Sequence, residues 1–169
     1  MLRWLWVTLI VVVIDQVTKL WAESVLLALN NVSDASAYKA LYYYKNIEVM
    51  PYFNFTLAYN PGAAFSFLAD QSGWQRWFFT VVSTVISGIL LYMIKQLKPT
   101  EKSEAIAYSL ILGGAIGNLI DRVAYGHVID FLDAYYQTSH WPAFNAADAA
   151  ITLGVMVMIG QMLLGKKTS

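Results

Sequence analysis

The chain has 169 residues, of which 58% are apolar and only 13% charged, whereas soluble domains average roughly 45–50% and about 25%. Eleven basic residues balance eleven acidic ones, which argues against nucleic-acid binding through a basic surface as the main function. The lack of cysteine excludes disulfides and thiolate chemistry. With too few polar groups to cover a globule in water, the chain is predicted to be a membrane protein.

Four stretches are long and apolar enough to cross a bilayer as helices, which takes about 20 residues. They are expected at about residues 4–22, 74–94, 103–123 and 146–165. The sequence therefore predicts a single polytopic membrane domain, an α-helical bundle of four transmembrane helices.

Two charges, Asp15 and Lys19, lie in the outer part of the first span at a spacing of i and i+4. A charge near the middle of a bilayer costs about 2.5–3.5 kcal/mol, so each needs a partner or a function. Either the two form an internal ion pair, or Asp15 caps or orients a polar loop. They also argue against a cleavable signal peptide, because they interrupt the apolar run and no small-x-small cleavage site follows promptly.

The segment between the first two spans is too long for a simple turn, and residues 52–60 alternate between apolar and polar side chains. Such alternation is typical of a half-buried strand. Asn60, Pro61 and Gly62 supply a turn, after which residues 63–68 are expected to return as a second strand. We expect a small antiparallel sheet, a cradle covering about residues 38–69, on the outer membrane surface.

The third span ends with several polar residues. Gly113 and Gly117 have the spacing that lets membrane helices approach closely, and Asn118, Asp121 and Arg122 follow on one face. This face should point into the bundle. An ion pair between Asp121 and Arg122 with a structural role is favoured over a catalytic role for Asp121.

Two further carboxylates lack a neighbouring base: Asp130, in an expected loop over about residues 124–145, and Asp148, at the start of the fourth span. Asn145 or Asp148 could cap that helix, although capping alone leaves Asp148 deeper than needed. If spans three and four are antiparallel neighbours, the two carboxylates could instead face each other and share a proton. Such a pair can activate water against an amide, but spacing alone leaves both readings open.

Other chemistries have weaker support. His127 and His140 lie near no Gly-x-Ser-x-Gly elbow, and together with Asp130 they make a poor metal-site pattern. Both histidines are expected to be exposed loop residues.

Orientation follows from the basic residues. Six of the eleven flank the spans on one side, namely Arg3, Lys95, Lys98, Lys102, Lys166 and Lys167. The positive-inside rule places this side, with both termini, in the cytoplasm.

Five ordered motifs span nearly the whole chain: Asp15-Gln16-x-x-Lys19; Tyr59-Asn60-x-Gly62-Ala63-Ala64-Phe65; Gly114-x-x-Gly117-Asn118-x-x-Asp121-Arg122; Gly126-His127-Val128-x-Asp130-Phe131; and Phe144-Asn145-x-Ala147-Asp148. In this order they resemble the motifs of the lipoprotein signal peptidase (signal peptidase II) family.

The resemblance implies an aspartic endopeptidase of the bacterial inner membrane, with a periplasmic β-cradle and an active site near the periplasmic face. Such enzymes remove signal peptides from diacylglyceryl-modified prolipoproteins, cutting before the lipidated cysteine. Asp130 and Asp148 match the catalytic pair, whereas the matches to site-ordering and structural positions are Asn60, Asn118, Asp121, Arg122 and Asn145, with Asp15, Lys19 and Gly62.

The resemblance further implies no metal and no organic cofactor, membrane lipids as surroundings, and inhibition by globomycin-type cyclic peptides. We expect a monomer that binds no nucleic acid. Asp133 is expected to be a solvated loop residue, and the segment 23–50 looks long for the family. The alternative function is a non-enzymatic membrane carrier or scaffold with a buried polar cluster.

Overall fold

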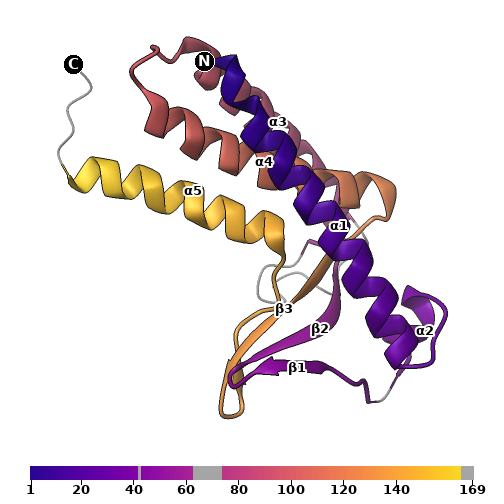
Figure 1. Ribbon diagram of the computed structural model, residues 1–169. Helices are drawn as coiled ribbons and strands as arrows, with labels where there is room; N and C mark the ends of the chain where they lie inside the picture. Colours follow the sequence, from indigo (N-terminus) through magenta and orange to yellow (C-terminus); the bar gives the residue numbers. More distant parts are fainter. Residues whose placement is uncertain (42, 63–73, 165–169) are drawn as a thin grey trace.

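A computed structural model describes residues 1–41, 43–62 and 74–164 (Figure 1). Four of its helices are long and apolar enough to cross a membrane: α1 (Leu5–Leu29, extended at its start by the short helix η1, Leu2–Trp4), α3 (Trp74–Gln96), α4 (Lys102–Ala124) and α5 (Ala146–Leu163). The predicted four-helix membrane fold is confirmed.

Helix α4 is the centre of the bundle and contacts each of the other three spanning helices. Half of its most apolar window is buried inside the protein, against 17–22% for the others. The outer faces of those helices carry many exposed large apolar side chains, such as Leu9, Val81 and Met156. Exposure of apolar surface of this extent is unfavourable in water, whereas such surface is compatible with the hydrocarbon core of a bilayer.

Glycines let α4 approach its neighbours. A Cβ at Gly113 would lie 2.6 Å from Val11 of α1, and one at Gly114 would overlap the backbone carbonyl oxygen of Ala147 in α5. At Gly117 an added Cβ would meet the Asp15 carboxylate. The small-residue spacing predicted for this helix therefore serves packing within one chain, on two different sides.

Gly114→Ala is expected to destabilise the protein by about 2 kcal/mol, because the methyl group meets rigid backbone rather than a movable side chain. Gly88→Ala in α3 is the matched control, since its Cβ would meet nothing within 4 Å. Thermal unfolding in detergent should show a lower Tm for the first variant and an unchanged or slightly higher Tm for the second. Equal melting of both variants would contradict this account of the helix contact.

The antiparallel sheet has the strand order β1-β2-β3-β4, made of β1 (Ile47–Met50), β2 (Phe53–Asn60), β3 (Val128–Tyr136) and β4 (Ser139–His140). It lies at one end of the bundle, and the start of α1 lies at the other end (Figure 1). One face packs on the end of α1, where Ala22 and Leu26 join Leu57, Ile129 and Phe131 in a buried cluster. The predicted sheet is confirmed, with its β2 strand over the alternating segment.

The sheet differs from the expectation in its partners. The expected second strand at residues 63–68 lies outside the described residues, and β2 pairs with β1 and with β3, a strand in the segment expected to be a loop. Val128, Ile129, Asp130 and Phe131 are all buried. A strand covered on both faces shows no alternation, which is why sequence reasoning missed it.

The segment between α1 and β1 also contains helical structure. Helix α1 continues to Leu29, past the expected limit near residue 22, and a short helix α2 (Ala35–Lys39) follows. Asp34 caps α2 by accepting hydrogen bonds from the backbone N–H groups of Ser36 and Ala37, both at 2.9 Å. Tyr38 of this helix is buried in the cluster between α1 and the sheet.

Candidate active site

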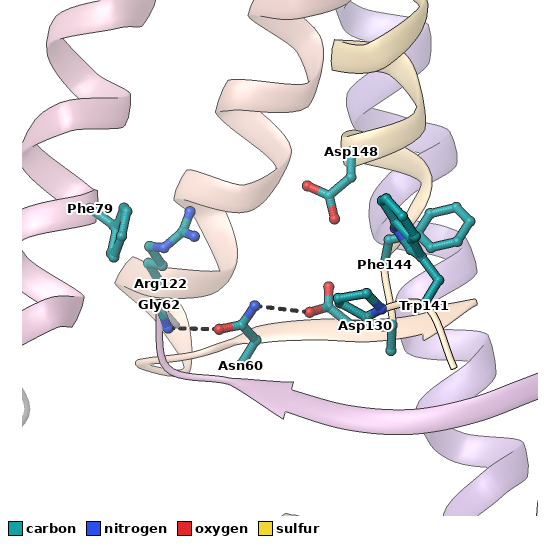
Figure 2. Close-up of a pocket in the computed structure, with 10 residues that line it drawn as sticks. Asn60, Gly62, Phe79, Arg122, Asp130, Trp141, Phe144 and Asp148 are labelled. Carbon is teal, nitrogen blue, oxygen red and sulfur yellow. Dashed lines mark hydrogen bonds between the residues drawn. The ribbon is translucent and has the colours of Figure 1, made fainter. Parts of the chain in front are cut away.

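A cavity of about 380 Å³ lies where the sheet meets the ends of α3, α4 and α5 (Figure 2). Its lining combines aromatic side chains with two carboxylates, an amide and a guanidinium: Asn60, Gly62, Phe79, Arg122, Asp130, Trp141, Pro142, Ala143, Phe144 and Asp148. The structure thus brings Asp130 and Asp148 to one cavity, and these two are the only carboxylates among the described residues that line it.

Asp130 lies on β3 with only 3% of its surface exposed. Its carboxylate accepts hydrogen bonds from the amide of Asn145 at 2.6 Å and from the amide of Asn60 at 3.1 Å. Burial raises the pKa of Asp130 to about 7, and the negative charge of Asp148 acts in the same direction. Near neutral pH this group can therefore exist in either protonation state.

Asp148 occupies the first turn of α5, as the third residue of a capping box with Asn145. The Asn145 side chain accepts from the Asp148 N–H at 3.0 Å, and the Asp148 carboxylate accepts from the Asn145 N–H at 3.3 Å. Asp148 is therefore not too deep for a capping role, contrary to the sequence-based interpretation, since this position completes the cap. Its other carboxylate oxygen accepts from the Asn118 amide at 2.8 Å, so it both caps the helix and faces the cavity.

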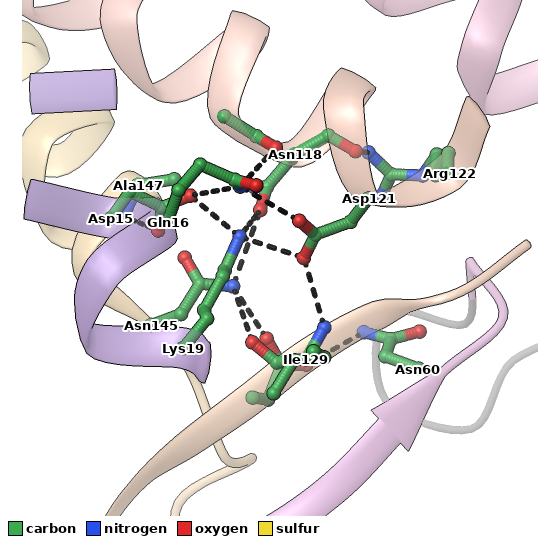
Figure 3. Close-up of polar contacts among 12 residues, drawn as sticks. Asp15, Gln16, Lys19, Asn60, Asn118, Asp121, Arg122, Ile129, Asn145 and Ala147 are labelled. Carbon is green, nitrogen blue, oxygen red and sulfur yellow. Dashed lines mark hydrogen bonds and ion pairs between the residues drawn. The ribbon is translucent and has the colours of Figure 1, made fainter. Parts of the chain in front are cut away.

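Behind the cavity a buried polar network is centred on Lys19 (Figure 3). The Lys19 ammonium lies 2.8 Å from Asp15 and 3.0 Å from Asp121, and all three side chains are at most 1% exposed. It also donates to the Asn118 side-chain oxygen at 3.0 Å. One cation is therefore shared by two buried carboxylates, which also accept hydrogen bonds from neighbouring N–H groups, the condition under which buried charge is tolerated.

The network connects separate elements to the cavity. Asp15 accepts from the N–H of Ala147 at 2.8 Å, at the start of α5, and Asp121 accepts from the N–H of Ile129 at 3.1 Å, next to Asp130 on β3. Asp15 is thus ion-paired, as one interpretation of the sequence has it, but it caps the start of helix α5 rather than a polar loop. These bonds hold the backbone at the residue directly before each of the two cavity carboxylates, Asp148 and Asp130.

Asn118 and Asn145 join the network to the cavity. The Asn118 oxygen accepts from Lys19 and, at 3.2 Å, from the Asn145 amide, while its own amide donates to Asp148. Asn145 bonds to Asp130 as well as to Asp148. Each carboxylate of the cavity is therefore oriented by an amide that is itself held in place.

The expected pairing of Asp121 with Arg122 is wrong, because Asp121 pairs with Lys19. The Arg122 guanidinium lines the cavity, lies 5.4 Å from the Phe79 ring centre and donates to the Asn118 backbone oxygen at 3.2 Å. Its buried Nε has no hydrogen-bond partner among the described residues. Buried polar atoms without a partner are rare in folded proteins and call for an explanation, and this atom belongs to a side chain that lines the cavity.

The turn after β2 completes the cavity. The Asn60 oxygen accepts from the Gly62 N–H at 2.9 Å, which turns the Asn60 amide toward Asp130 (Figure 2). Gly62 has a positive φ of 120°, and a Cβ there would lie 2.6 Å from the Phe79 ring. Both observations require glycine at this position.

Three residues depart from the sequence-based expectation. Asp133 is not solvated: it is 5% exposed and bonded to His140 at 2.9 Å. His127 is partly buried, with its ring 4.8 Å from that of Tyr59. Sequence reasoning also gave no role to Gln16, whose amide donates to Asp121 at 2.8 Å; a polar residue beside Asp15 in an apolar helix was the available signal.

Comparisons with known proteins place this geometry in context. A family profile described as signal peptidase (SPase) II matches residues 7–164. Among curated relatives, lipoprotein signal peptidases of Pseudomonas putida and Aeromonas hydrophila are 48% and 45% identical, over 99% and 94% of this chain and 90% and 86% of theirs. A solved structure described as a bacterial membrane enzyme is 31% identical with a TM-score of 0.74, covering 99% of this chain and 93% of its own. A second, at 30% identity, has a TM-score of 0.71 over 98% and 94%.

Proposed function

Because the chain belongs to the signal peptidase II family, we propose that it is an aspartic endopeptidase that removes signal peptides from diacylglyceryl-modified prolipoproteins. The family implies a protease in a multi-pass membrane protein. The proposal adds the chemistry, in which Asp130 and Asp148 act on the amide bond before the lipidated cysteine.

The observation that carries the proposal is that these two carboxylates line one cavity and are oriented by the side-chain amides of Asn145 and Asn118, which are hydrogen-bonded to each other. In the proposed mechanism Asp130 holds a proton and donates a hydrogen bond to the scissile carbonyl, while Asp148 takes a proton from the attacking water. The tetrahedral intermediate then collapses, the C–N bond breaks, and a carboxyl proton passes to the leaving amine. The Arg122 guanidinium and the Asn60 side chain line the same cavity, where they can bind the substrate backbone.

The setting follows from the charge pattern. We place the end of the bundle that bears the sheet on the periplasmic side of the bacterial inner membrane, and both termini in the cytoplasm. Arg3, Lys95, Lys98 and Lys102 flank the opposite ends of the helices, as the positive-inside rule requires. The cavity would then lie near the membrane boundary, where a lipid-anchored substrate can reach it.

The test uses the purified full-length protein and two synthetic peptides that differ only in the diacylglyceryl group on cysteine. We expect cleavage before the modified cysteine, inhibition by globomycin, and little cleavage of the unmodified peptide. Equal cleavage of both peptides would contradict the proposed substrate class. Binding without any cleavage would favour the non-enzymatic carrier or scaffold.

The proposed role of Asp130 also predicts a pH dependence. The pKa of Asp130 is raised to about 7 by burial and by Asp148, so kcat/KM should fall as the pH rises through this value and Asp130 loses its proton. In Asn60→Ala the decline should move to higher pH, because the Asn60 amide donates to the charged carboxylate and thereby lowers its pKa. Rate profiles of both proteins on the lipid-modified peptide measure the shift, and a shift to lower pH would refute the role of Asp130.

A further inference from the structure

A second hollow, of about 270 Å³, lies beside the cavity and shares Trp141 and Ala143 with it. Its polar lining includes Asn46, Thr56, Asp133 and His140. Asp133 is the only carboxylate among the described residues that line it. None of these polar groups has a part in the chemistry described above.

Asp133 is held in a fixed position at the edge of this hollow. Both of its carboxylate oxygens lie within 3.0 Å of His140 Nδ1, and one accepts from the Asn54 amide at 3.3 Å. The Asp133 side chain is 7% exposed and that of His140 is 52% exposed. The pair therefore combines an anchored carboxylate with an imidazole that remains open to solvent.

An irregular register brings Asp133 to the same side of the sheet as Asp130. On β2 their partners Ala58 and Asn54 are four residues apart, whereas the two aspartates are three apart on β3. In a regular strand, side chains three residues apart point to opposite faces. With the shift, Asp133, Thr56 and Ala58 line the hollow that adjoins the cavity of Asp130.

The other side of the cavity is apolar. A groove of about 490 Å³ continues along α5 from Asp148 past Thr152 and Leu153 to Met156. This apolar groove extends along the membrane-spanning helix α5, whereas the hollow at Asp133 lies on the sheet. A substrate that carries lipid at the cleavage point and continues as a water-soluble chain needs surfaces of both kinds.

We propose that the hollow at Asp133 and His140 binds the second or third residue after the scissile bond, and that it favours a cationic side chain there over an acidic one. The proposal rests on the proposed function. Asp133 follows Asp130 by three strand residues, a distance of about 10 Å. An extended peptide with its scissile amide at Asp130 would place its second or third following residue beside Asp133.

The test compares lipid-modified peptides that carry lysine or aspartate at the second or third position of the mature part. At the position that reaches the hollow, the wild-type enzyme should prefer lysine about three- to five-fold in kcat/KM, as expected for a partly exposed ion pair. Asp133→Asn should bring this ratio close to one. The matched control Glu48→Gln removes an exposed charge from the same sheet and should leave the ratio unchanged.

His140→Lys provides a second test that does not depend on the folding of Asp133→Asn, because His140 is largely exposed. The added cation should lower the preference for lysine. The subsite is wrong if the wild-type enzyme cleaves all peptides equally, or if the preference persists in both variants. If the wild-type enzyme cleaves no lipid-modified peptide, the proposed function itself fails.

Discussion

Asp130→Asn and Asp148→Asn are each expected to lower turnover of a diacylglyceryl-modified peptide by about 10³-fold or more, because an amide cannot exchange protons with water or with the leaving amine. Asparagine keeps the size of the side chain and one acceptor oxygen, so it can still accept the bond from Asn145 at position 130 and the bond from Asn118 at position 148. It loses the second acceptor, which serves Asn60 or the Asn145 N–H, so a modest loss of Tm is expected beside the much larger loss of kcat.

The measurement is cleavage by each purified variant, together with its Tm. Glu48→Gln serves as the control, since it also neutralises an acidic residue but on the exposed strand β1, outside the cavity. It should retain wild-type turnover. A folded Asp130→Asn or Asp148→Asn variant with wild-type turnover would rule out the two-carboxylate mechanism.

Lys19→Met is expected to destabilise the protein by about 3–5 kcal/mol, the usual cost of removing one partner from a buried charge network. Asp15 and Asp121 would remain buried without their cation, although methionine fills a similar volume. Lys45→Met is the matched control, because Lys45 is exposed. Thermal unfolding in detergent should show a large loss of Tm for the first variant only.

Two causes of the lower Tm can be separated: the uncompensated charges of the carboxylates and the lost packing contacts of the lysine side chain. Adding Asp15→Asn and Asp121→Asn to Lys19→Met removes the uncompensated charges, so the triple variant should melt above the single variant. If the triple variant melts at or below the single variant, the destabilisation comes from the contacts of the lysine stem. A Lys19→Met protein as stable as the wild type would show that the network contributes nothing.

The sequence predicts most clearly those features that contiguous residues determine. The four spans follow from the length of their apolar runs, and β2 (Phe53–Asn60) follows from the alternation of residues 52–60. The sequence also predicts Asn145 as a possible helix cap, because Asn is a preferred residue at a helix start, and Asn145 is the N-cap of α5. Even here the ends shift, since α1 continues to Leu29 where the segment is no longer purely apolar.

Partners that are distant in sequence could not be predicted in the same way. Asp121 has Arg122 as its neighbour in the chain, but adjacent residues on a helix point in different directions. Because α1 packs against α4, Asp121 forms its ion pair with Lys19 of α1 instead. Asp133 looked like a loop residue because β3 is buried on both faces, and its position beside the cavity depends on a register shift against β2.

The sequence by itself thus determined a four-span membrane protein and, through its resemblance to a family, the two carboxylates proposed to act as a pair. Only the tertiary structure decided how Asp130 and Asp148 are oriented and which charge balances which. The physical reason is that membrane insertion depends on composition summed along a segment, whereas the cavity depends on close helix contacts, such as that of Gly114 with Ala147, and on strand register. Those are set by residues about 30 to 130 positions apart.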